Sequence, residues 1–217
     1  MAQANGETRG ILAIWKDCRA GHEAEFEHWY QSEHLQERLA IPGFLLGRRF
    51  EAVAGSPRFF ACYVTQSPEI LGSAPYLARL NAPTPMTRRG MTEMFVDMTR
   101  ALCRQAYRRG DCRGGFAVTA RFNDAVADAE LIAALDALPG GAGMACAELW
   151  TALASGEVAV TTEEYLRGRD RKIHACLTVE TLRQADAEAV AATLRRQFPS
   201  AEIGVYRLLC EIEPPVA

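Results

Sequence analysis

The 217-residue sequence predicts an α+β fold in which two consecutive ferredoxin-like βαββαβ halves pack their antiparallel sheets into one α/β barrel. Short apolar runs typical of strands alternate with helical patterns in the order β-α-β-β-α-β, and that order occurs twice. Fragments of the halves also match: the Ile-Pro-Gly of 41–43 corresponds to the Leu-Pro-Gly of 138–140. A four-stranded sheet with helices on one face leaves the other face bare, so two such faces are expected to cover each other.

The first half is expected over 10–108, after a polar N-terminal tail at 1–9. Pro42 and Gly43 end its first helix, and Ser67 caps the second with Pro68 in its first turn. The two prolines of 82–85 exclude a helix there. The expected elements are a strand (10–15), a helix (22–40), a hairpin (44–53 and 59–65), a helix (67–81) and a strand within 94–105.

A turn-rich linker at 109–115 leads to a second half over 116–217, in which the same order returns. Its helices are expected at 125–138 and 183–198, and the first of them ends at another Pro-Gly pair. Its strands are expected at 116–122, 144–154, 172–179 and 202–212.

Composition limits the class of protein. The formal net charge of −3 argues against a nucleic-acid partner, because such proteins usually carry a basic face. No apolar run approaches the roughly 18 residues that span a bilayer, and the polar N-terminus does not resemble a secretory signal. The seven cysteines are scattered singly, which is typical of reduced core thiols. We therefore expect a cytoplasmic protein that contacts neither nucleic acid nor membrane.

His34 is the strongest candidate for chemistry. A histidine titrates near neutral pH, so it can transfer protons, and Tyr30, Glu37 and Arg38 lie within one helical turn of it. The alternative is a structural histidine bonded to the backbone at the helix end. A metal site with His22 and His28 is not expected, because six-residue steps place the three rings about 120° apart around the helix.

Other side chains are candidates for binding a substrate. Trp29 lies beside Tyr30 on the helix, where ordinary core packing is the alternative. Trp15 and Tyr63 are expected to line the barrel interior. Arg48 and Arg49 point to opposite faces of one strand, so one of them is expected to face inward. Its partner is then a carboxylate, with Glu33 and Glu37 as candidates, or an anionic ligand.

Together these residues resemble a known family. The segments Trp15-Lys-Asp, Phe26-x-x-Trp-Tyr, Glu33-His, Glu37-Arg, Pro42-Gly-Phe and Arg48-Arg are similar to the EthD-like group of the dimeric α/β-barrel superfamily, over about residues 10–107. The resemblance implies a ferredoxin-like fold, with His34 facing a cleft between sheet and helix. The helix expected at 125–138 has no histidine, tryptophan or tyrosine, so we expect one such site per chain.

We expect this site to bind a small, largely apolar, oxygenated molecule, aromatic or polyketide-like, without a cofactor or metal. Acid–base chemistry by His34 would make the protein a lyase or isomerase, with a monooxygenase as a further possibility. Alternatives are a non-catalytic binding or accessory protein of a catabolic pathway, and a haem-binding barrel with His174 as axial ligand. Bare sheet faces and short edges favour closure within or between chains, and we expect a homodimer.

Overall fold

The computed structural model describes residues 8–139, 143–154 and 160–214. Its strands alternate with short helices, some of which join into longer helical stretches. In chain order the elements are β1 (Gly10–Cys18), α1 (Glu23–Trp29), the π-helical turn η1 (Tyr30–His34), α2 (Leu35–Leu39), β2 (Phe44–Ala54), β3 (Phe59–Thr65), the 3₁₀ helix η2 (Pro68–Gly72), α3 (Ala74–Asn81), α4 (Pro85–Arg89), the π-helical turn η3 (Gly90–Met94), β4 (Phe95–Arg109), β5 (Phe116–Phe122), α5 (Asp128–Ala137), β6 (Met144–Ala152), α6 (Thr162–Arg167), β7 (Ala175–Thr181), α7 (Gln184–Gln197) and β8 (Glu202–Ile212).

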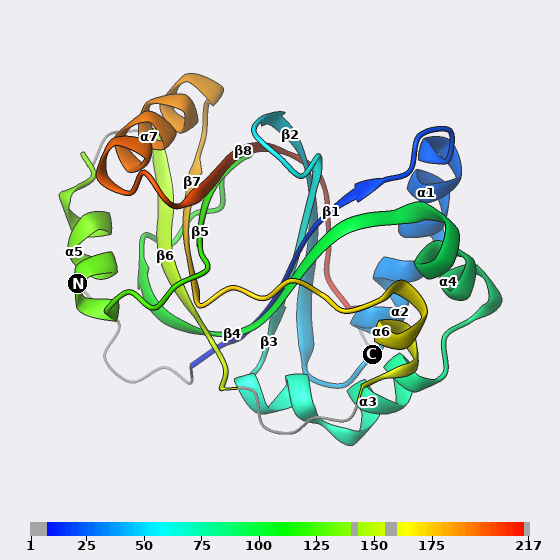
Figure 1. Cartoon of the computed structure of the whole chain (residues 1–217). Helices are drawn as coiled ribbons and strands as arrows, with labels where there is room; N and C mark the ends of the chain where they lie inside the picture. The colour runs from blue at the N-terminus through cyan, green and yellow to red at the C-terminus, as the bar shows by residue number, and fades with distance from the viewer. Residues whose placement is uncertain (1–7, 140–142, 155–159, 215–217) are drawn as a thin grey trace.

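The strands form one closed barrel in the order β1-β3-β2-β8-β5-β7-β6-β4 (Figure 1). Each βαββαβ half supplies four neighbouring strands, and all strand pairs are antiparallel. The halves join along two seams: Arg49 pairs with Cys210 between β2 and β8, and Arg104 pairs with Thr151 between β4 and β6. The barrel therefore closes within a single chain.

Side chains alternate along each strand, so every strand serves two separate cores. On β1, Ile11, Ala13 and Trp15 point into the barrel, whereas Leu12 and Ile14 point toward the helices. Aromatic rings fill much of the interior: Trp15 stacks on Phe60 at 5.0 Å between centroids, and Phe60 stacks on Phe50 at 5.2 Å. The barrel is thus a packed core over most of its length.

The helices lie outside the barrel in two groups, one on each half (Figure 1). α5 and α7 cover the second half, and the core beneath them is built of apolar side chains such as Leu131, Leu177 and Leu194. α1 to α4 cover the first half. α6 follows β6 in the chain but packs beside α3 and η3, so the second half contributes a helix to the first half's helical layer.

Most expected elements are present, and the differences have local causes. A helical stretch over 85–94 was not expected; Pro85 occupies its first turn, where no backbone N–H is needed, and Thr84 accepts a hydrogen bond from the Thr87 N–H. α6 was also not expected between the strands predicted at 144–154 and 172–179; Thr161 caps it by accepting a hydrogen bond from the Glu164 N–H. The first helix was expected as regular, but it contains the π-helical turn at Tyr30–His34.

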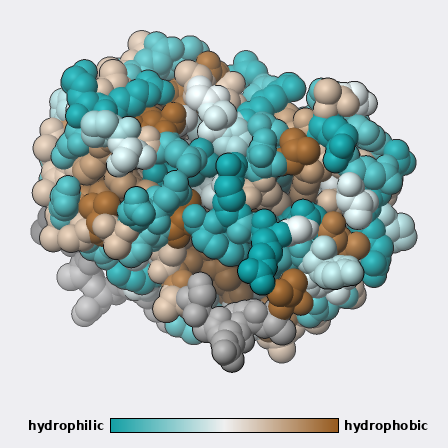
Figure 2. Space-filling model, viewed as in Figure 1, coloured by the Kyte–Doolittle hydropathy of each residue, from teal (hydrophilic) through white to brown (hydrophobic). Residues whose placement is uncertain are grey.

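Hydrophilic side chains cover much of the face shown in Figure 2, and the hydrophobic ones are scattered among them. Within the described ranges, no helix combines the length and apolar character that crossing a membrane requires.

Candidate functional site

The π-helical turn determines where His34 points. The Leu35 N–H bonds to the Tyr30 carbonyl five residues back, so the helix widens by one residue between α1 and α2. A second π-helical turn, η3, lies opposite, and Gly90 at its start leaves room for the Trp29 ring. A Cβ at residue 90 would lie 2.9 Å from that ring. The two π-helical turns together bring Trp29 and His34 against the sheet.

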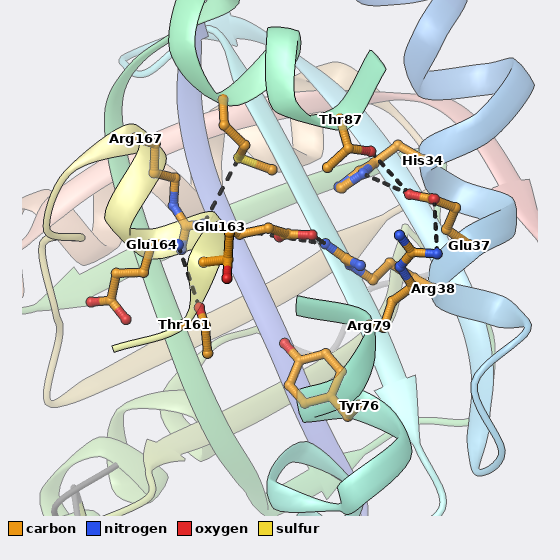
Figure 3. Close-up of polar contacts among 12 residues, drawn as sticks. His34, Glu37, Arg38, Tyr76, Arg79, Thr87, Thr161, Glu163, Glu164 and Arg167 are labelled. Atoms are coloured by element: carbon orange, nitrogen blue, oxygen red, sulfur yellow. Dashed lines mark hydrogen bonds and ion pairs between the residues drawn. The ribbon is translucent and has the colours of Figure 1, made fainter. Parts of the chain in front are cut away.

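His34 is buried, with 2% of its surface exposed. Its ring packs against Trp29 at 4.5 Å and against Tyr30 at 4.9 Å between centroids. Nδ1 lies 3.9 Å from Glu37 Oε2, which is too far for a hydrogen bond, and it has no hydrogen-bond partner among the described residues. Glu37 instead accepts a hydrogen bond from Thr87 and pairs with Arg79 (Figure 3). A carboxylate is therefore near His34 without fixing its tautomer.

A small cavity lies beside the His34 ring, between the sheet and the helices. Its volume is about 10 Å³, which is room for about one water molecule. Its apolar walls include Leu80, Met91 and Met98. Its charged lining is dominated by cations: Lys16, Arg38, Arg100 and Arg167, with Glu163 as the carboxylate.

Arg38 and Arg167 are held by carboxylates in α6 and in the segment just after it. Both carboxylate oxygens of Glu163 lie 2.6 Å from Arg38 Nη2, and Arg167 binds Asp170 at 2.6 Å (Figure 3 shows Arg38, Glu163 and Arg167). Arg38 Nη1 has no hydrogen-bond partner among the described residues. Arg38 Nη1 and His34 Nδ1 therefore both lack a hydrogen-bond partner among the described residues, and both residues line this cavity.

Arg100 and Lys16 approach the cavity from the sheet. Arg100 Nη2 donates to the Tyr76 hydroxyl at 2.5 Å, and Lys16 Nζ donates to the Tyr30 hydroxyl at 2.7 Å. Arg49, on β2, lies over the Tyr30 ring at 4.3 Å from its centroid, and its two terminal nitrogens each donate to one oxygen of Glu27 at 3.0 Å. The apolar core beneath the first half's helices therefore contains a buried polar network, whereas the core beneath α5 and α7 consists of apolar side chains.

Burial and charge determine the protonation states. Burial lowers the pKa of His34 well below its usual value, and Arg38 and Lys16 lower it further, so His34 is neutral near pH 7. Burial raises the pKa of Tyr30 and raises that of Tyr63 well above its usual value. Both tyrosines are therefore protonated in the folded protein near pH 7, and His34 is neutral.

The structure divides the residues proposed from sequence into two groups. His34, Tyr30, Trp29, Tyr63 and Arg49 lie between the first half's sheet and its helices. Tyr63 was expected inside the barrel. It instead faces the helices, where its ring packs against that of Phe44 at 6.0 Å between centroids. The side chains of β3 that point into the barrel are Phe60 and Cys62, and Tyr63 follows them on the opposite face.

Trp15 and Arg48 belong to the barrel interior. Trp15 Nε1 donates to Thr119 Oγ1 at 3.2 Å across the barrel. Arg48 pairs with Glu180 and with Glu211. Glu33 and Glu37, the partners suggested by sequence for the two arginines, pair with neither, since Arg49 is held by Glu27.

A larger cavity of about 600 Å³ opens at one end of the barrel, where Arg48 and Trp150 line it. Its charges are internally compensated: besides the Arg48 pairs, Arg108 pairs with Glu148 and Arg113 with Glu211. Trp150 Nε1 donates to Glu148 at 2.6 Å. This cavity has space but no excess charge, whereas the His34 cavity has excess charge and little space.

A haem held by His174 does not fit the second half. His174 lies directly before β7, where its N–H bonds to the Phe122 carbonyl at 2.7 Å and its carbonyl accepts from the Ala152 N–H at 2.9 Å. The layer beneath α5 and α7 is filled by apolar side chains, and the described core there contains no histidine. In the part of the chain that the structure covers, no group of three or more His, Cys, Asp or Glu side chains is placed to hold a metal ion.

Sequence reasoning did not assign four residues of this cavity: Lys16, Arg100, Glu163 and Arg167. The sequence did contain one indication for Lys16: it continues an apolar strand run, and it is one of only two lysines in the chain. Glu163 and Arg167 reach the cavity through α6, and no local pattern connects that helix to the first half.

No family model and no curated protein matches this sequence. Solved structures with very different sequences share the fold. An anthrone oxidase-like protein matches with a TM-score of 0.61 at 10% identity, covering 98% of this chain and 95% of that one. A candidate monooxygenase from Fusobacterium nucleatum matches with a TM-score of 0.56 at 7% identity, covering 96% of each chain. A candidate chlorite dismutase matches with a TM-score of 0.53 at 12% identity, covering 94% of this chain and 96% of that one. The chain therefore shares the fold of these proteins, and it closes its barrel within one polypeptide.

Proposed function

We propose that the first half binds a small oxygenated molecule beside His34 and that His34 removes a proton from it without a bound cofactor. The observation that carries this proposal is a neutral, buried histidine whose Nδ1 is unbonded, in a cavity lined by the three arginines Arg38, Arg100 and Arg167. A neutral imidazole can accept a proton, and nearby cations favour the negative charge that then develops on the ligand. The proposed chemistry is abstraction of a proton from a carbon whose C–H bond is acidified by a carbonyl group, either adjacent to it or conjugated with it.

The residues have distinct roles in this proposal. His34 is the base, and Arg38, whose Nη1 is unbonded, supplies positive charge beside the oxygen on which charge develops, together with Arg100 and Arg167. Trp29, Tyr30 and Tyr63 supply the surrounding wall, with Arg49 behind it. Trp15 and Arg48 lie in the barrel and support the sheet. A ligand larger than water enters by displacing Met91 and Met98, whose side chains are flexible.

The EthD-like resemblance supports the same location. Its helix motif, which contains Trp29, Tyr30 and His34, falls in this layer, and we place the chain in that group on this basis. The anthrone oxidase-like neighbour suggests an aromatic ketone with an acidic C–H bond as a first probe. An enolate formed by His34 would lead to isomerase or lyase chemistry, or to oxygenation if molecular oxygen reacts with it.

The test is exchange of ligand C–H for deuterium. Anthrone and a small 1,3-diketone are incubated with the protein in D₂O, and the exchange is followed by NMR while an electrode records oxygen uptake. His34→Gln should slow exchange by about 10²–10⁴-fold, the usual contribution of a general base. His28→Gln, on the same helix but outside the cavity lining, should leave the rate unchanged.

Each outcome has a defined meaning. Exchange that depends on His34 supports the proposal, and oxygen uptake with the same dependence identifies an oxygenase. Binding of both probes without exchange would identify a non-catalytic binding protein and reject the proposed chemistry. Equal exchange by His34→Gln and the wild type would remove His34 from the site.

A homodimer remains part of the proposal. Because β2–β8 and β4–β6 close the barrel within one chain, the interface of a dimer would lie on the outer surface, away from these seams. Light scattering at micromolar concentration tests it: a dimer gives twice the 23.8 kDa chain mass, and a 23.8 kDa species rejects it.

A further inference from the structure

Lys16 is a buried amine with no acidic partner. Only 1% of its surface is exposed, and Nζ donates one hydrogen bond, to the Tyr30 hydroxyl at 2.7 Å. The rest of its surroundings are aromatic: Nζ lies 4.0 Å from the ring centroid of Tyr30, 4.6 Å from that of Phe95 and 5.7 Å from that of Phe26. Among the described residues, Arg38, Arg49 and Arg167 of the same layer each pair with a carboxylate, whereas Lys16 forms no ion pair.

The arginines around Lys16 disfavour a positive charge on its amine. Arg49, Arg167 and Arg38 act on it from β2, α6 and α2, and the Cys18 thiol is the weak opposing influence. Burial is the largest effect, and together these groups lower the pKa of Lys16 well below its usual value. The neutral amine is the form that attacks carbonyl carbon, and desolvation beside other cations is a known way to obtain it.

The choice of lysine at this position is informative. The chain has 24 lysine and arginine residues, of which only Lys16 and Lys172 are lysines. Arginine stays charged under all ordinary conditions, whereas a buried lysine can lose its proton. A permanent cation here could have been an arginine, as at Arg38, Arg49, Arg100 and Arg167. A lysine is required where the nitrogen must be able to act as a nucleophile.

We propose that Lys16 captures a small carbonyl compound as a Schiff base inside the His34 cavity. Lys16 and His34 both line this cavity, so a carbonyl compound bonded to Nζ, in space opened by displacement of Met91 and Met98, would lie on the same side of the sheet as the imidazole. Besides Lys16, the lining carries three arginines and one carboxylate, which favours an aldehyde or ketone that also bears a negative charge, such as an oxo acid.

The reaction is balanced as a condensation. The electron pair of neutral Nζ forms a bond to the carbonyl carbon, while the carbon–oxygen π pair moves to oxygen. One proton passes from nitrogen to that oxygen. A second proton from solution allows the oxygen to leave as water, and the product is a protonated Schiff base on Lys16.

This inference deepens the proposed function, on which its catalytic use rests, because a protonated Schiff base acidifies the neighbouring C–H bond that His34 would remove. Capture itself does not need His34. The two ideas can therefore fail separately, and the experiment is designed to distinguish them.

The test traps the Schiff base by reduction. The folded protein is treated with glyoxylate and sodium cyanoborohydride at pH 6.5, and modified lysines are located by peptide mass spectrometry. Lys172 is the built-in reference, because its side chain is about half exposed, at 55%. We expect Lys16 to be carboxymethylated at least severalfold faster than Lys172, because burial lowers the pKa of Lys16 well below its usual value and leaves more of its amine neutral.

Variants separate capture from proton transfer. Lys16→Arg should lose the adduct, and Lys16→Met should lose it while preserving the apolar packing. His34→Gln should keep the adduct even where it abolishes deuterium exchange. Modification of Lys172 alone in the folded protein, with Lys16 reacting only after unfolding in guanidinium, would overturn the inference.

Discussion

Arg38 on α2 and Glu163 on α6 form a buried ion pair that joins the two halves of the chain, with both Glu163 oxygens 2.6 Å from Arg38 Nη2. Each side chain is 3% exposed. The pair is separated by 125 residues in sequence, so it links the helix contributed by the second half to the site of the first. It also keeps Arg38 in place at the edge of the cavity, and this relationship leads to the first prediction.

Glu163→Gln should destabilise the protein by about 3–5 kcal/mol, because it leaves the Arg38 charge buried without a partner. Urea unfolding measures this free energy. The control is Glu93→Gln in the exposed Arg89–Glu93 pair, whose side chains are 46% and 51% exposed and whose loss should cost less than about 1 kcal/mol. Equal losses in the two variants would show that α6 is not held by this pair.

Protonation of His34 should oppose folding. Because its pKa is lowered in the folded protein, the unfolded chain binds a proton below pH ~6.5 that the folded chain does not. Stability should therefore fall as the pH decreases from 7 to 5, at a slope of up to about 1.4 kcal/mol per pH unit from this group. His34→Gln should reduce that slope. NMR titration of the imidazole provides a direct check, and a His34 pKa at or above 6.5 would contradict the prediction.

Lys16 should affect stability over a different range of pH. The unfolded chain keeps the Lys16 proton up to pH ~10.4, whereas the folded chain releases it earlier, so stability from this group rises with pH between the two values. Lys16→Met should remove this rise, and at pH 7 it should be at least as stable as the wild type. Chemical unfolding at several pH values between 7 and 10 compares the two slopes. Parallel curves would mean that Lys16 is an ordinary charged lysine in the folded protein.

Gly90→Ala should disturb the contact that positions Trp29. The added methyl would lie 2.9 Å from the Trp29 ring, and this overpacking should cost about 1–3 kcal/mol. Gly72→Ala is the matched control, since nothing lies within 4 Å of a Cβ there. It should be neutral or stabilising by up to about 1 kcal/mol. Thermal unfolding and tryptophan fluorescence report both effects, and identical behaviour of the two variants would contradict the prediction.

Most of the fold could be predicted from the sequence, because apolar runs and Pro-Gly stops are local signals. The strands over 116–122 and 202–212 coincide with β5 and β8. The site was harder. His34 was identifiable because histidine, tyrosine and tryptophan crowd one helix, but the direction of Tyr63 depended on a strand register that no local pattern reports. Glu163 and Arg167 come from α6, which reaches the first half only in the folded chain.

Because the barrel closes within one polypeptide, its two halves can differ in sequence. In an assembly of two identical chains, every substitution is made twice, and each side must tolerate it. Here β2 and β3 are joined by a short turn at 55–58, whereas the corresponding connection at 153–174 carries α6. The second half accordingly has an apolar helical layer, and its helix α6 packs against the first half. In the joined chain the two sides therefore differ: the helical layer of the second half is apolar, and that of the first half contains buried charged and polar side chains.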